Sequence, residues 1–100
     1  MIRHIVLFKL KEFDSPEEKR KASETLKTEL LGMKDKIAVI REFEVGINLT
    51  NDPSAFDVVI NSSFDSLADL ETYRVHPEHQ AFIRFNRNFS ERKILADYIF

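Results

Sequence analysis

Residues 2–10 constrain the fold most, because the strand that they predict is apolar on both faces. The segment is rich in β-branched and aromatic side chains, which favours a β-strand. Alternation divides it into one face with Ile2, His4, Val6, Phe8 and Leu10 and another with Arg3, Ile5, Leu7 and Lys9. Apolar residues in the middle of both faces indicate a strand that is covered on two sides rather than one.

A helix start follows this strand. Ser15 is a good N-cap, Pro16 suits the first helical position, and Glu18 completes a capping box. Apolar side chains then recur three or four positions apart, at Ala22, Leu26, Leu30, Met33 and Ile37. This spacing predicts one helix with a single buried stripe.

The remaining pattern completes an α+β fold. Alternating residues predict three more strands, over residues 39–48, 56–64 and 91–99. A second helix starts at Asp65 or Ser66, and Pro77 opens a further helical stretch to about residue 89. The order is that of the ferredoxin-like β-α-β-β-α-β unit, which predicts a four-stranded antiparallel sheet with the helices on one face.

The other face of this sheet is also expected to be apolar. Ile5, Leu7, Val59 and Leu95 are assigned to it and would be exposed together on a lone chain. A second sheet packed face to face would bury them. The sequence therefore predicts a homodimer through the sheet face.

Composition narrows the class of protein. The 100 residues predict a single domain, 1–100, with a formal net charge of −2 and no cysteine. Acidic and basic residues alternate, so no basic face is expected to bind nucleic acid or an anionic membrane. No signal pattern is visible, and no apolar run approaches the roughly 20 residues that cross a bilayer. These features predict a soluble cytoplasmic protein.

Most of the histidine and tyrosine side chains, which are suited to acid–base chemistry, lie within residues 73–79. His79 has the side chain for proton abstraction near neutral pH, although it also suits a partly exposed first turn of a helix. Tyr73 can orient His79 or donate to a developing enolate oxygen, or it can be a core tyrosine. His76 either caps the helix that Pro77 opens or contacts a ligand. In the first strand, His4 is either a core histidine or a catalytic one.

A metal or cofactor is not expected. His76 and His79 are three positions apart, but no cysteine and no close carboxylate pair completes a tetrahedral set. The sequence contains no phosphate loop, nucleotide fingerprint or serine nucleophile motif.

The whole chain resembles the stress-responsive dimeric α/β-barrel (Dabb) family. The resemblance rests on residues 2–9 (IRHIVLFK), 43–48 (FEVGIN), 64–67 (FDSL), 73–79 (YRVHPEH) and 97–98 (DY). It implies a ferredoxin-like protomer whose sheet pairs with that of a partner to form a dimeric α/β barrel. In the branch that cyclises linear polyketides by aldol condensation, His79 would match the general base, Tyr73 its support, and His4 a pocket residue. The cyclase's tyrosine on the first helix has no counterpart within residues 22–31.

Three functions remain open at this stage. The leading hypothesis is a homodimer of unassigned biochemical role that binds a small apolar or aromatic molecule between helices and sheet, contacted by His76, Phe8, Phe82 and Phe85. The second is a lyase or polyketide-cyclase-like enzyme with His79 as base. The third is a structural, stress-protective oligomer. An open cavity separates the first two from the third.

Overall fold

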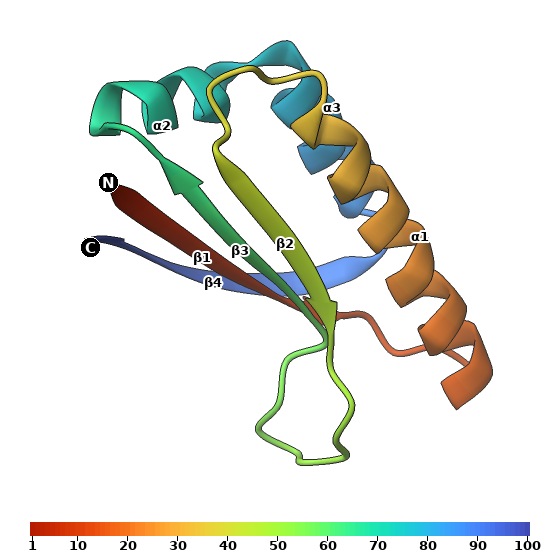
Figure 1. Ribbon diagram of the computed structural model, residues 1–100. Coiled ribbons are helices and arrows are strands. Elements are labelled where there is room, and N and C mark those ends of the chain that lie inside the picture. Colours follow the sequence, from red (N-terminus) through yellow and green to blue (C-terminus); the bar gives the residue numbers. More distant parts are fainter.

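The computed structural model describes residues 1–100. In chain order its elements are β1 (Ile2–Leu10), α1 (Pro16–Lys34), β2 (Glu42–Ile47), β3 (Val58–Phe64), α2 (Leu67–Val75), α3 (Pro77–Asn86) and β4 (Ser90–Ile99). The strands form one antiparallel sheet in the order β2-β3-β1-β4, and the helices lie on one side of it (Figure 1). The predicted ferredoxin-like α+β arrangement is confirmed.

The helices start where the sequence predicts. Ser15 accepts a hydrogen bond from the backbone N–H of Glu18 at 3.1 Å, and Ser66 accepts one from Asp69 at 3.1 Å. These caps satisfy backbone donors that a helix leaves without an internal partner. The first helix ends at Lys34, so Ile37 lies beyond it. The side chain of Ile37 is nevertheless buried, with 1% exposed.

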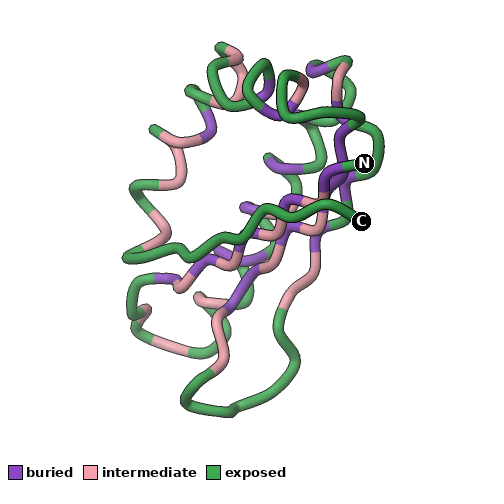
Figure 2. The backbone as a smooth tube through the Cα atoms, turned by 90° about the vertical axis from the view of Figure 1, so that its left-hand side faces the viewer, coloured by how far each residue is buried: buried purple, intermediate pink, exposed green.

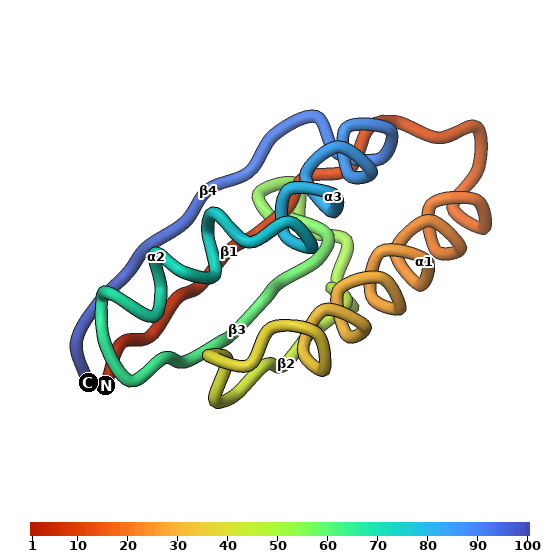
Figure 3. The backbone as a smooth tube through the Cα atoms, turned by 90° about the horizontal axis from the view of Figure 1, so that it is seen from above, coloured from red at the N-terminus to blue at the C-terminus, as the bar shows by residue number.

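Seen from above, α1 lies on the β2 side of the sheet, and α2 and α3 follow one another on the β1 side (Figure 3). The apolar core fills the space between the helices and the sheet and includes the alternate residues Ile2, Val6, Phe8 and Leu10 of β1. None of the helices is long and apolar enough to span a lipid bilayer.

Two strands begin later than the sequence predicts. Residues 39–41 are irregular and precede β2, and β3 begins at Val58 rather than at residue 56. Asp57, a buried carboxylate, directly precedes β3. It accepts the backbone N–H of Leu10 at 2.8 Å and pairs with Lys19 of α1 at 2.9 Å. Asp57 therefore ties the end of β1 to α1.

The open face of the sheet differs from the prediction at one residue. Leu7 of β1 stands opposite Val59 of β3 and Ile94 of β4, whereas Leu95 stands opposite Val6 on the helix face. The assignment of Leu95 to the open face is wrong, and Ile94 takes its place. Side chains alternate along a strand, so the register of one residue decides the face of all the others.

The last strand is the least covered part of the sheet. Every residue of β4 except Ser90 is exposed, including Ile94 (47%), Leu95 (52%), Tyr98 (50%) and Ile99 (79%). Figure 2 shows this edge strand as a nearly continuous exposed path to the C-terminus. Apolar side chains gathered on an exposed edge are typical of a surface that a partner covers.

Candidate functional site

A break between two helices builds the candidate site. His76 ends α2 and caps α3, accepting the backbone N–H of Glu78 on its Nδ1 at 3.1 Å. Pro77 follows, and its ring and missing N–H prevent one continuous helix. The carbonyl of Arg74, near the end of α2, accepts the side chains of His79 at 2.9 Å and Gln80 at 2.8 Å. The break thus turns His79 back toward α2.

The hydrogen bond to Arg74 decides which nitrogen of His79 is basic. A carbonyl oxygen only accepts, so Nδ1 of His79 donates, and Nε2 carries the free lone pair of the neutral ring. Burial lowers the pKa of His79 below its usual 6.5, although the bond to Arg74 opposes this change. Electrostatic interactions with Lys93, His4 and Arg74 lower that pKa further. A neutral imidazole of this kind can accept a proton at neutral pH.

Tyr73 packs directly against this histidine. The ring centroids of Tyr73 and His79 are 4.4 Å apart, and those of Tyr73 and His4 are 5.9 Å apart. Tyr73 is 1% exposed, and burial raises the pKa of its phenol far above the usual 10.0. Its hydroxyl forms no hydrogen bond within the chain. Every polar side-chain atom that is fully buried has a hydrogen-bond partner, so the Tyr73 hydroxyl is not fully buried. It is accessible from a cavity and, being protonated, can donate a hydrogen bond there.

His4 is paired with a carboxylate that the sequence did not assign to the site. Its Nδ1 donates to Oδ1 of Asp97, which stands opposite it across β1 and β4. The side chain of His4 is only 7% exposed, so this bond satisfies a polar ring in an apolar setting. Because Asp97 meets His4 only through strand pairing, no local sequence pattern reveals the contact.

The three predicted catalytic residues line one cavity of about 120 Å³. Its apolar walls are formed by Val6, Phe8, Ile60, Phe82, Ile83 and Leu95, and its other polar lining by Arg74, Gln80 and Lys93. The structure thus brings His4, Tyr73 and His79 together between helices and sheet. Of the predicted ligand contacts, Phe8 and Phe82 lie in this cavity, whereas His76 and Phe85 do not.

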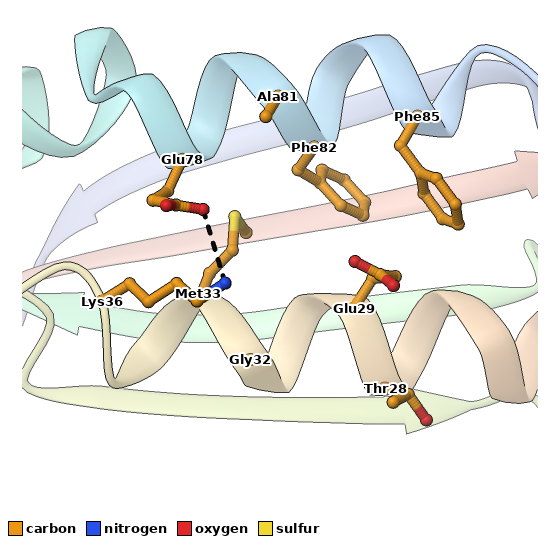
Figure 4. A pocket seen from close by; sticks show the side chains of 9 residues that line it. All are labelled: Thr28, Glu29, Gly32, Met33, Lys36, Glu78, Ala81, Phe82 and Phe85. Carbon is orange, nitrogen blue, oxygen red and sulfur yellow. Dashed lines mark ion pairs between the residues drawn. The ribbon is translucent and has the colours of Figure 1, made fainter.

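A second hollow of about 300 Å³ lies between α1 and α3. Figure 4 shows Phe82 and Phe85 directed from α3 toward α1, and the ion pair of Lys36 and Glu78, 3.7 Å apart, at one end. No histidine or tyrosine lines this groove. It has apolar surface and charge but no group suited to proton transfer near neutral pH, so the histidine cavity is the candidate site.

No group of three or more His, Asp or Glu side chains is placed to hold a metal ion. His76 and His79, the pair with metal-like spacing, each use Nδ1 for a separate bond within the helix break.

Comparisons with known proteins agree on the family and the fold of this chain. Residues 2–100 match the Stress Responsive A/B Barrel Domain. An uncharacterized protein of Streptomyces coelicolor is 37% identical over 100 residues, 100% of each chain. A dimeric protein of unknown function and ferredoxin-like fold from Bacteroides fragilis is 36% identical, with a TM-score of 0.86 over 99% of this chain and 95% of its own. The hydroxynitrile lyase of Passiflora edulis shares the fold, with 20% identity and a TM-score of 0.81 over 99% of this chain and 92% of its own.

We expect the pKa of His79, followed by the NMR shifts of its ring protons, to lie below 6.5, the usual value. Below that pH the unfolded chain takes up a proton at His79 before the folded chain does. Folding stability should therefore fall as the pH drops through this range, and His79→Gln should remove part of the slope. A midpoint at or above 6.5 would show that burial does not lower the pKa of His79.

Proposed function

Because the chain belongs to the stress-responsive A/B barrel domain family, we propose that it is a homodimer whose protomers each bind a small apolar or aromatic molecule between helices and sheet. The observation that carries this proposal is that His4, Tyr73 and His79 converge on a cavity that the surrounding phenylalanines leave open. A purely structural oligomer needs no such space.

The cavity is small, but its lining resembles that of a ligand-binding site. Seven of the twelve residues that line it are hydrophobic, and its polar groups come from four elements: β1 with His4, α2 with Tyr73 and Arg74, α3 with His79 and Gln80, and β4 with Lys93. Apolar walls bind the body of a ligand, while a few fixed polar groups orient it. The phenol of Tyr73 has no partner within the chain, so a ligand acceptor would satisfy it.

The homodimer is supported by the open face of the sheet. Ile5, Leu7 and Val59 are only partly covered, and Ile94 is 47% exposed. The relative from Bacteroides fragilis with 36% identity is dimeric. Two such faces packed together would bury the apolar surface on both protomers.

A second candidate function is a lyase or cyclase with His79 as general base. It is favoured by a specific observation, the neutral ring with Nε2 free beside an unpartnered phenol. In this reaction Nε2 would take a proton from the carbon next to a carbonyl, and Tyr73 would donate to the resulting enolate oxygen. The Passiflora edulis lyase shares only the fold with this chain.

Binding can be tested with phenol, a one-ring probe, by following the NMR resonances of Val6, Phe82 and His79. We expect saturable shifts that Leu95→Trp abolishes, because the larger ring enters the cavity from a partly exposed wall rather than from the core. Ile99→Trp is the matched control, since Ile99 points to the same side of β4 but does not line the cavity. No shifts with the unmodified protein, or shifts unchanged by Leu95→Trp, would refute the binding site.

The dimer can be tested with Leu7→Asp in sedimentation equilibrium. A carboxylate buried without a partner costs about 2 kcal/mol. With two copies in each dimer, Kd should rise on the order of a thousandfold. Leu31→Asp, on an exposed position of α1, should leave Kd unchanged. A monomeric native protein at micromolar concentration would rule out the assembly.

The enzymatic alternative predicts that the protein accelerates exchange of the methyl protons of acetophenone in D₂O. His79→Ala should lower the rate at least about 100-fold, the usual contribution of a general base. Tyr73→Phe should lower it about tenfold or less, since it removes one hydrogen bond. Circular dichroism checks that both variants fold. Equal rates with the native protein and His79→Ala would exclude this role of His79.

A further inference from the structure

Lys93 places a positive charge at the cavity without a carboxylate to balance it. It lies on β4 opposite Phe8, so its side chain is on the helix face of the sheet, and it lines the cavity. None of the ion pairs of the chain includes Lys93. No aspartate or glutamate lines the cavity either.

The other charged or titratable groups near the cavity are already occupied. Arg74 pairs with Glu71 at 2.8 Å, and His4 is bonded to Asp97. Arg92, the neighbouring residue of β4, points to the open face of the sheet and not to the cavity, and its guanidinium stacks over the ring of Phe56 at 5.1 Å. Lys93 is therefore the cation at this site that is available to a ligand.

The volume of the cavity limits the size of such a ligand. An apolar cavity of about 150 Å³ holds one benzene molecule, and this cavity measures about 120 Å³. The enclosed part of a ligand is accordingly no larger than one ring or a short branched chain. The apolar walls at Val6, Ile60 and Phe82 favour a hydrocarbon body over a polar one.

We propose that the cavity selects monocarboxylates of this size, with the hydrocarbon body between the helices and the sheet and the carboxylate at Nζ of Lys93. This inference rests on the proposed binding function and names its substrate class. A single charge suits the site, because one available ammonium group faces an otherwise apolar lining. A phosphate dianion would keep one negative charge without a partner. The free energy that it loses on leaving water would exceed the free energy that it gains from pairing with one cation.

Two pairs of matched probes test the inference, namely benzoate with benzamide and isobutyrate with isobutyramide. Each pair has almost the same shape and differs in charge. Affinities come from NMR titration of the cavity resonances at low ionic strength, where charge interactions are least screened. We expect each carboxylate to bind about three- to fivefold more tightly than its amide, the range of a partly exposed ion pair.

Lys93→Met should abolish this preference, because it lowers the affinity for the two carboxylates more than the affinity for the two amides. Lys21→Met is the matched control, because it removes the same charge from an exposed position of α1 that does not line the cavity. It should preserve the preference.

The outcomes separate the two proposals. If amides and carboxylates bind equally, or if Lys93→Met keeps the preference, the assignment of Lys93 is wrong while the binding site stands. If neither pair nor phenol binds, the proposed binding function fails and this inference fails with it.

Discussion

The inner strand β1 is the element on which the rest of the structure depends. It pairs with β3 on one side and β4 on the other, and its alternate side chains serve two different surfaces. Val6, Phe8 and His4 face the helices, where they form the core and one wall of the cavity. Ile5 and Leu7 face away from the helices and form the centre of the proposed dimer surface. A strand with both faces in use tolerates no shift of register, because a shift by one residue exchanges the two surfaces.

The fold could be predicted from the sequence because its signals are local. Caps such as Ser15 and Ser66 act within a few residues, and strand alternation is visible within one segment. The errors arise where distant residues meet. The sequence places Leu95 on the wrong face because its register depends on pairing with β1, and the contacts of Asp57 with Leu10 and Lys19 join residues that are far apart in the chain. Neither contact has a sequence pattern of its own.

The residues of the candidate site also differ in whether local sequence or contacts between distant residues place them. Tyr73 and His79 could be predicted as neighbours because the break at Pro77 lies between them, and their rings are 4.4 Å apart. The tautomer of His79 could not be predicted, since it depends on the free carbonyl of Arg74. Asp97 and Lys93 reach the site only through the pairing of β4 with β1. Local sequence therefore places the proposed proton acceptor, and tertiary pairing places the charges around it.

The last strand connects the two functional surfaces. Along β4, Lys93, Leu95 and Asp97 face the cavity side, while Ile94, Ala96 and Tyr98 alternate with them on the open face. As an edge strand, β4 is held through its pairing with β1 alone. In the proposed dimer a partner sheet would cover the open face and fix β4 from that side. Assembly would then also fix the positions of Lys93 and Asp97, because consecutive residues of one strand cannot move independently. The exposed edge strand that the proposed partner would stabilise is thus also the strand that supplies Lys93 to the cavity.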